Sequence, residues 1–340
     1  MGLNTPPFVI AEMSGNHNQS IDRAFEIVDA AAKAGVAALK IQTYLPETMT
    51  LDSDKPDFWI QDPQSLWSGR SLFDLYGEAY TPWDWHEPIF QRCRDHGITV
   101  FSTPFDVTSV DFLESIDCPF YKIASFENID IPLIRYVART QKPIIISTGM
   151  ATIGELDAAI QTIRGEGNNQ IVMLKCTSSY PASPEFSDVR TIPHMRDLFG
   201  CEIGLSDHTL GIGAAVAAVA LGATVIEKHF TLARADGGVD SAFSLEPEEM
   251  ANLVVESERA WLSLGKISYG PTPGDVKSLA FRRSIYVSKD IKVGETFTKD
   301  NVRVVRPGHG LPPRMYDEIL GRKAGVSLTS GTALRLDHLA

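Results

Sequence analysis

Two apolar runs with a helical segment between them occur in 202-EIGLSDHTLGIGAAVAAVALGATVIEKHF-230. Each run has the length of a buried strand and ends in residues that can do chemistry, His208 in the first and His229 in the second. The segment 211–222 is apolar nearly all round, as in a helix packed hard against a sheet. The stretch therefore predicts a strand–helix–strand unit with parallel strands.

The same unit recurs along the first two-thirds of the chain. Six further apolar runs complete a series of eight: 8-FVIAEM-13, 38-ALKIQTY-44, 98-ITVFSTPF-105, 120-FYKIAS-125, 143-PIIISTG-149 and 171-IVMLKCTS-178. Helical periodicity is predicted in 21–35, 129–140, 152–166 and 246–264, with Ser20 and Gly35 as the caps of the first of these segments. Eight such units predict an α/β fold, the (β/α)8 TIM barrel. An open doubly wound sheet is the alternative, but no glycine-rich phosphate turn follows the first run.

The chain changes character after the barrel. Residues 266–281 are rich in Gly and Pro and are predicted to link a barrel at 1–265 to a separate domain at 282–340. Short strand-like runs, turns and a short helix near 315–320 make that domain a small β-rich module. Within the barrel, the connection 45–82 is long and aromatic, which favours a substrate-facing role for part of it.

Bulk composition narrows the class of protein. A net charge of −12 over 340 residues argues against nucleic acid as a partner. No apolar stretch approaches the roughly 18 residues that a membrane span needs. The N-terminus has no signal-peptide pattern, so we expect no membrane partner and a cytoplasmic location. The four cysteines form no CxxC pair, and we expect them to be free.

Chemistry-bearing residues stand where the runs end. A parallel barrel brings all these ends to one face, which holds the active site. We therefore expect one cup to contain Glu12, Lys40, Gln42, Thr103, Lys122, Ser125, Ser147, Ser178, Ser206, His208 and His229. Such a cup suits a phosphorylated, oxygen-rich substrate and a divalent metal.

The two histidines end neighbouring strands and are candidate ligands of one metal ion. Two imidazoles leave coordination positions open for water and substrate oxygens, as a Lewis-acid catalyst requires. Lys40 and Lys122, with the hydroxyls around them, predict a cradle for phosphate and carboxylate. Glu12 is the main acid/base candidate, and Asp240 after the eighth run is a second.

Each assignment has an alternative. The alternative for the histidines is that they are strand-end residues satisfied by hydrogen bonds. The alternative for Glu12 is that it accepts hydrogen bonds from loop amides. The lysines suit peripheral salt bridges, or one of them a Schiff-base aldolase.

These residues belong to sequence motifs that, taken together and in order, resemble those of the sialic acid synthases over nearly the whole chain. The motifs are AEMSGNHNQS, LKIQTY, FSTPFD, YKIASFE, ISTGMA, KCTSSYPA, GLSDHT, IEKHFTL and RPGHGL. Residues 282–340 resemble the antifreeze-like (SAF) domain of those enzymes. The branch of the family that makes pseudaminate is resembled by four motifs: SGNHNQS, SLWSGRSLFDLY, TPWDWH and KIASFEN. The motif CTNxYP, typical of N-acetylneuraminate synthases, is replaced here by CTSSYP.

The resemblance implies a reaction. Phosphoenolpyruvate condenses with open-chain 2,4-diacetamido-2,4,6-trideoxy-altrose, giving pseudaminate and phosphate by C–O cleavage. Legionaminate or N-acetylneuraminate synthesis on the same scaffold is the nearest alternative, and a non-catalytic carbohydrate-binding protein is a more distant one. The implied metal is Mn²⁺, with Co²⁺ or Mg²⁺ as alternatives.

The resemblance also implies roles for individual residues. Phosphoenolpyruvate is held by the equivalents of Lys40, Thr103, Lys122, Ser125, Ser147 and Ser206, with Ser178 beside them. Glu12 and Gln42 lie at the reacting centre, and Glu127, Tyr180 and Asp240 contact the sugar. Arg306 matches an arginine that reaches into the partner subunit's site, which implies a domain-swapped homodimer. Trp59, Trp67 and Trp83 are expected to give an apolar wall to a sugar that lacks its terminal hydroxyl.

Overall fold

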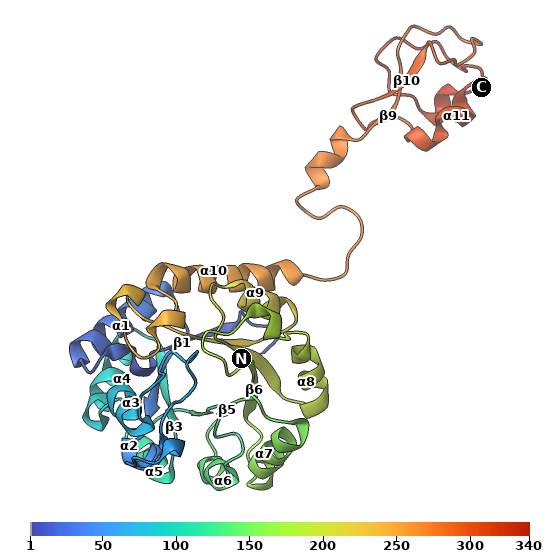
Figure 1. The fold of residues 1–340 in the computed structure, drawn as a ribbon. Helices are drawn as coiled ribbons and strands as arrows, with labels where there is room; N and C mark the ends of the chain where they lie inside the picture. Colours follow the sequence, from blue (N-terminus) through green and yellow to red (C-terminus); the bar gives the residue numbers. More distant parts are fainter. Residues whose placement is uncertain (1) are drawn as a thin grey trace. The chain divides into compact units, whose positions relative to one another are not determined.

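The computed structural model describes residues 2–340 and divides the chain into two compact units, Met1–Gly265 and Lys266–Ala340. In the first unit, eight parallel strands follow one another around a closed barrel, and the helices lie outside it (Figure 1). This confirms the predicted TIM barrel, and the alternative of an open doubly wound sheet is wrong. The strands are β1 Phe8–Glu12, β2 Ala38–Thr43, β3 Thr99–Pro104, β4 Tyr121–Ile123, β5 Ile144–Ser147, β6 Ile171–Cys176, β7 Glu202–Asp207 and β8 Val225–His229.

Side-chain caps begin several of the helices that cover the barrel. The principal helices are α1 Ile21–Ala34, α4 His86–Asp95, α5 Val107–Ser115, α6 Ile131–Arg139, α7 Ile153–Gly165, α8 Thr191–Phe199, α9 Gly213–Ala220 and α10 Pro247–Leu264. Both predicted caps of α1 are confirmed, because Ser20 accepts a hydrogen bond from the Arg23 amide and Gly35 takes φ 82°. Two shorter helices, α2 Pro46–Met49 and α3 Leu72–Ala79, lie in the long connection between β2 and β3.

Strand register sets which side chains share the interior of the barrel. Glu12 on β1 is paired with Lys40 on β2 and with His229 on β8. Ser206 on β7 is paired with Cys176 on β6 and with Glu227 on β8. Because successive side chains of a strand point to opposite faces, polar residues two apart reach the same interior. The intervening residues are buried against the helices, as expected for a parallel sheet covered on its outer face.

The second unit has its own small core. The strands β9 Ser284–Val287 and β10 Val302–Val305 pair antiparallel, and α11 Tyr316–Ile319 lies where a short helix was predicted. Ile285, Phe297 and Leu334 are fully buried among the apolar residues of this unit. The predicted linker carries a 3-10 helix, Val276–Phe281.

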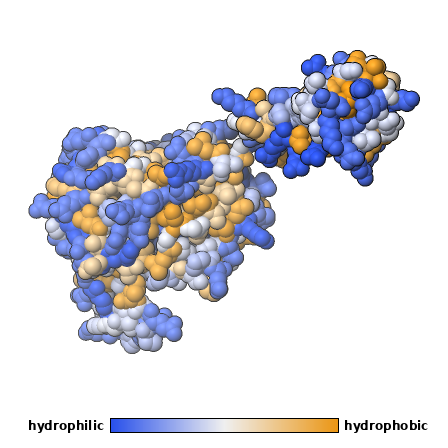
Figure 2. Space-filling model, turned by 90° about the horizontal axis from the view of Figure 1, so that it is seen from above, coloured by the Kyte–Doolittle hydropathy of each residue, from blue (hydrophilic) through white to orange (hydrophobic). Residues whose placement is uncertain are grey.

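The surface of the first unit mixes hydrophilic and hydrophobic side chains in the view of Figure 2. Single exposed apolar residues are normal for folded proteins. Within residues 2–340, no helix combines the length and the apolar character needed to cross a bilayer.

Candidate active site

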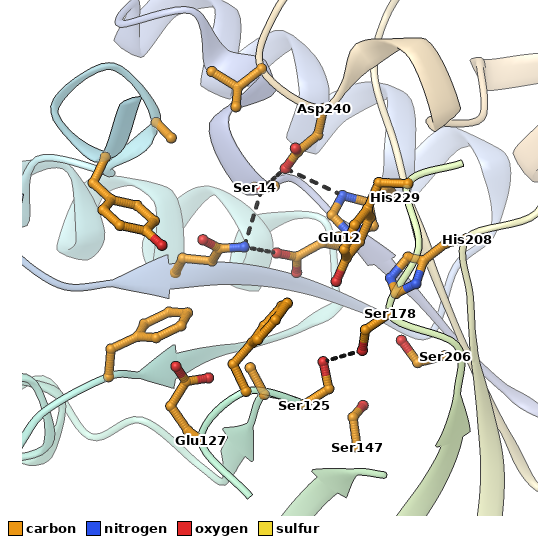
Figure 3. Close-up of a pocket in the computed structure, with 18 of the residues that line it drawn as sticks. Glu12, Ser14, Ser125, Glu127, Ser147, Ser178, Ser206, His208, His229 and Asp240 are labelled. Atoms are coloured by element: carbon orange, nitrogen blue, oxygen red, sulfur yellow. Dashed lines mark hydrogen bonds and ion pairs between the residues drawn. The ribbon is translucent and has the colours of Figure 1, made fainter. Parts of the chain in front are cut away.

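A cavity of about 520 Å³ opens at the C-terminal ends of the strands. Figure 3 labels ten of its residues, with the two histidines, Glu12 and Asp240 close together and Ser125, Ser147, Ser178 and Ser206 below them. The structure brings most of the predicted site residues to its lining: Glu12, Lys40, Gln42, Lys122, Ser125, Glu127, Ser147, Ser178, Tyr180, Ser206, His208, His229 and Asp240. Thr103 is buried beside this set, where its Oγ1 accepts a hydrogen bond from Lys40 Nζ at 3.2 Å.

Four buried charges lie at the floor of the cavity. Lys40 Nζ is 2.7 Å from Glu12 Oε2 and 3.7 Å from Glu227 Oε1, and Lys122 Nζ is 3.3 Å from the same Glu227 oxygen. The two lysines of the predicted anion cradle therefore lie among carboxylates as well as hydroxyls. Each ammonium group already has a carboxylate partner, because an unpaired buried charge is costly.

The protonation of this cluster follows from burial and charge together. Burial raises the pKa of Glu12, and the Lys40 ammonium opposes that rise. Burial also pushes the pKa of Glu227 upward, but the ammonium groups of Lys122 and Lys40 outweigh it and hold the pKa below its usual value. Burial lowers the pKa of Lys122, against the attraction of Glu227. Glu227 is thus the charged anchor that two lysines share.

Hydroxyl groups lie around the lysines. Ser178 Oγ donates to Ser125 Oγ at 2.8 Å, and Ser206 Oγ donates to Glu227 Oε1 at 3.4 Å. Among the residues described, Ser147 Oγ is buried without a hydrogen-bond partner. A buried polar group without a partner is costly, which points to a ligand as its missing acceptor. Gly149 makes the close approach feasible, since a Cβ there would lie 2.5 Å from Ser125 Cβ at a φ of 50°.

The two histidines are neighbours at the ends of β7 and β8, with ring centroids 5.3 Å apart and ring planes tilted by 58°. His208 Nδ1 is 2.9 Å from the Thr177 carbonyl oxygen, so this nitrogen donates and Nε2 is the ring nitrogen that could bind a ligand. Nothing in residues 2–340 hydrogen-bonds to His229 Nδ1, which is 3.6 Å from Asp240 Oδ2. Burial and the charges of His208 and Lys40 hold the pKa of His229 well below its usual value, so its ring is neutral.

The two imidazoles do not by themselves make a complete set of protein ligands for a metal ion. No group of three or more His, Cys, Asp or Glu side chains within 2–340 is arranged around one point as metal ligands. Burial opposes the charged form of His208, but contacts with Cys176 outweigh burial and raise the pKa of His208, so only the His229 ring is held neutral. Two imidazoles, one with an unpartnered nitrogen, could supply two ligands to an ion whose remaining ligands come from water and substrate.

Asp240 lies in a small polar network with the β1 end. Ser14 Oγ donates to Asp240 Oδ2, and Gln42 Nε2 donates both to Ser14 Oγ at 3.1 Å and to Glu12 Oε1 at 2.9 Å. Burial raises the pKa of Asp240, against the hydrogen bond from Ser14. Gln42 therefore fixes Glu12 and, through Ser14, the orientation of Asp240.

Glu127 and Tyr180 lie at the sides of the cavity. Burial raises the pKa of Glu127 to about 7, and Glu127 Oε2 is without a hydrogen-bond partner in the described part of the chain. The Tyr180 ring is 4.5 Å from the His208 ring and 5.3 Å from the Phe243 ring. Both residues are placed to contact a ligand held between the lysines and the histidines.

Three lining residues were missed or misread from the sequence. Glu227 was not among the predicted site residues, although its position two residues before His229 in a strand puts both on the same face. Cys176 was expected only to be free, and it is free and buried and also lines the cavity. Ser14 was not singled out, because its contact with Asp240 joins positions 226 residues apart.

The remaining predicted residues are Arg306, whose role in a partner's site stays a prediction, and the three tryptophans of the expected apolar wall. Arg306 belongs to the second unit and is exposed there. Of the three tryptophans expected to form an apolar wall, Trp67 lines the cavity. The prediction is wrong for the other two: Trp83 stacks on Phe112 at 4.6 Å, and Trp59 is 40% exposed in a β-bridge with Ser71.

Comparisons with known proteins agree with this architecture. Residues 27–269 match the model of the NeuB family and residues 282–340 that of the SAF domain. The chain is 45% identical to the pseudaminic acid synthase of Campylobacter jejuni subsp. jejuni serotype O:2 over 96% of this chain and 95% of that one. It is 42% identical to the pseudaminic acid synthase of Helicobacter pylori over 98% of each chain. The crystal structure of the N-acetylneuraminic acid (sialic acid) synthetase of Leptospira borgpetersenii superposes with a TM-score of 0.72 at 30% identity, covering 81% of this chain and 91% of that one. The chain therefore belongs to the NeuB family, with a SAF domain at its C-terminal end.

Proposed function

We propose that this chain is a transferase that condenses phosphoenolpyruvate with open-chain 2,4-diacetamido-2,4,6-trideoxy-altrose to give pseudaminate and phosphate. The observation that carries the proposal is the meeting of two lysines and two histidines at one end of the barrel. Similarity to two pseudaminic acid synthases over nearly the whole chain supports this choice among nonulosonate products.

Phosphoenolpyruvate takes the lysine side of the cavity. Its phosphate and carboxylate accept from Lys40 and Lys122 and from the hydroxyls of Ser125, Ser147 and Ser206, with Thr103 and Ser178 supporting them. Ser147 Oγ gains the acceptor that it lacks. The enol carbon then faces the histidine side, where the sugar aldehyde is held.

Bond formation joins the methylene carbon of phosphoenolpyruvate to the aldehyde carbon, and the aldehyde oxygen takes up a proton. Positive charge develops at the carbon that carries the phosphate ester. Glu12 stabilises this charge and orients the water that adds there, and Gln42 holds Glu12 in place. The adduct loses phosphate by cleavage of the C–O bond, which leaves the keto acid.

His208 and His229 would hold a divalent ion, and we propose Mn²⁺, with Co²⁺ or Mg²⁺ as substitutes. When bound, such an ion polarises the aldehyde as a Lewis acid. Asp240, Glu127 and Tyr180 orient the sugar. Removal of the ion with EDTA is expected to abolish turnover, and Mn²⁺ is expected to restore it.

We further propose that two copies exchange their SAF domains, so that Arg306 of one copy completes the sugar site of the other. Mixing two inactive variants tests this. Arg306→Ala and His229→Ala alter different domains, so with exchanged domains one of the two sites in each heterodimer is intact. Because random pairing makes half of the dimers heterodimers, the co-refolded mixture as a whole is expected to recover about a quarter of wild-type activity. No recovery from a mixture that forms heterodimers would contradict the exchange.

The substrate assignment is tested with purified enzyme, phosphoenolpyruvate and each candidate sugar. We expect the altrose derivative to be preferred over N-acetylmannosamine and over the precursor of legionaminate. Equal turnover of N-acetylmannosamine would overturn the pseudaminate assignment and leave the family intact.

A Schiff-base aldolase is the second candidate, because burial lowers the pKa of Lys122, as an amine nucleophile requires. Its contact with Glu227 argues for the charged form. Borohydride treatment with pyruvate is expected to leave Lys40 and Lys122 unmodified, whereas labelling of either would favour the aldolase.

A further inference from the structure

The cavity has two chemically different halves. Its floor consists of the charged and hydroxyl-bearing strand ends described above. One side comes from the connection between β2 and β3, which contributes an apolar wall made of Met49, Ile60, Trp67, Leu72 and Leu75, with the hydroxyl-bearing Ser65 and Tyr76 beside it. A ligand that fills the cavity therefore meets charge at one end and hydrocarbon at the other.

The apolar wall is held in place by local structure. Residues 59–71 form a hairpin, in which the Ile60 amide donates to Arg70 O at 2.9 Å and the Gly69 amide donates to Ile60 O at 2.8 Å. Ser71 then caps α3 by accepting from the Asp74 amide. This cap starts the helix so that Leu72 and Leu75, three residues apart, lie on the same face. The wall thus exists before a ligand binds.

Trp67 connects the apolar wall to the loops that contain Val239 and Tyr180. Its Nε1–H donates to the Val239 carbonyl oxygen at 2.9 Å, next to Asp240, and its ring is 5.9 Å from that of Tyr180. The indole N–H is therefore used, and what the ring offers to the cavity is hydrocarbon. Ser65 Oγ accepts from the Trp67 amide at 3.2 Å, which ties this hydroxyl to the hairpin. These contacts place the wall beside the residues proposed to hold the sugar.

We propose that the apolar wall is the subsite for a methyl group that the sugar carries in place of a terminal hydroxymethyl group, and that the connection between β2 and β3 thereby selects deoxy sugars. This inference rests on the proposed function. Burial of a methyl group against the wall is favourable. A hydroxyl at the same place would lose water without gaining a partner from Ile60, Leu72 or Leu75.

Two sugars that differ by one oxygen test the inference: 2,4-diacetamido-2,4,6-trideoxy-altrose and its counterpart with a hydroxyl at C6. A hydrophobic pocket discriminates between such ligands by roughly 10- to 200-fold in kcat/KM. We expect the wild-type enzyme to prefer the deoxy sugar within this range. Leu72→Gln and Ile60→Thr are each expected to reduce the preference about tenfold and to leave the KM for phosphoenolpyruvate unchanged.

Leu66→Gln is the matched control. Leu66 lies in the same hairpin, is 48% exposed, and is outside the set of lining residues found within 2–340. Its replacement is expected to leave the preference as in the wild type. Thermal unfolding of all variants identifies any that fail to fold, and the two wall variants lie in different local structures.

A third sugar, with one acetamido group replaced by hydroxyl, separates the two sources of a methyl group. If the wall variants change discrimination against this sugar and not against the C6 hydroxyl, the wall holds an acetyl group and the inference is overturned. An unchanged preference in both folded wall variants, or equal use of both C6 sugars by the wild type, also overturns it while the proposed function stands. A wild-type enzyme that turns over none of these sugars defeats the proposed function itself.

Discussion

The inner and outer faces of β7 and β8 carry opposite kinds of buried ion pair. On the inner face, Glu227 shares one oxygen with Lys122 at 3.3 Å and Lys40 at 3.7 Å, and its other oxygen is without a hydrogen-bond partner in the described chain. On the outer face, Lys228 Nζ lies 2.7 Å from Asp207 Oδ2 and 2.6 Å from Thr209 O. The outer pair is satisfied by the protein, while the inner cluster keeps capacity for a ligand. Adjacent residues of one strand thus serve stability and chemistry separately.

The largest effect is expected on the inner face. His229→Ala removes one of the two imidazoles and should lower kcat/KM by about 10³-fold or more, because Lewis-acid assistance contributes several kcal/mol. The fold should survive, as judged by circular dichroism and thermal unfolding. His194→Ala is the control, since His194 is exposed on α8, and it should retain activity. Full activity and metal content in His229→Ala would contradict the metal assignment.

The outer face should respond in stability. Lys228→Met leaves Asp207 buried without its partner and should cost about 3–5 kcal/mol in urea unfolding. Arg259→Met is the control, because Arg259 pairs with Glu256 at 2.6 Å on the exposed side of α10, where an ion pair contributes about 0–1 kcal/mol. Equal losses in both variants would show that the outer pair is no more important than a surface contact.

A titration distinguishes a ligand-facing carboxylate from a structural one. The folded-state pKa of Glu127 is about 7 and its unfolded value is 4.5. The folded state therefore binds more protons between these values, and its stability falls as the pH rises from about 4.5 to 7, by about 3 kcal/mol at most. Glu127→Gln should flatten the stability profile in this window. A profile that keeps the same slope would place the titration on another group.

The smallest effect is expected at Gly149, where Ser125 leaves no room for a Cβ. Gly149→Ala should destabilise by about 2 kcal/mol, because its Cβ would meet Ser125 at a positive φ. It should also raise the KM for phosphoenolpyruvate. Gly154→Ala is the matched control in α7, where a Cβ would meet nothing within 4 Å among residues 2–340, and it should stabilise by up to about 1 kcal/mol. Similar behaviour of the two variants would remove the steric argument.

Much of this molecule follows from local patterns. Apolar runs that end in polar residues predicted the strands, and the period of two put Lys40 and Gln42 on one face. Contacts between distant segments were not predictable in this way. Trp67 lines the cavity and Trp83 does not, because one indole donates across to Val239 and the other to the Tyr44 carbonyl oxygen on its own side. Glu227 joins two lysines only because the barrel closes.

The central claim is that the lysine and histidine sides of one cavity act together on two substrates. The most direct measurement is phosphate and keto-acid formation from phosphoenolpyruvate and 2,4-diacetamido-2,4,6-trideoxy-altrose, by enzyme freed of metal and then given Mn²⁺. We expect phosphate and a nine-carbon acid in equal amounts, only when both substrates and the ion are present. Phosphate release without the sugar, or equal turnover without the ion, would contradict the claim.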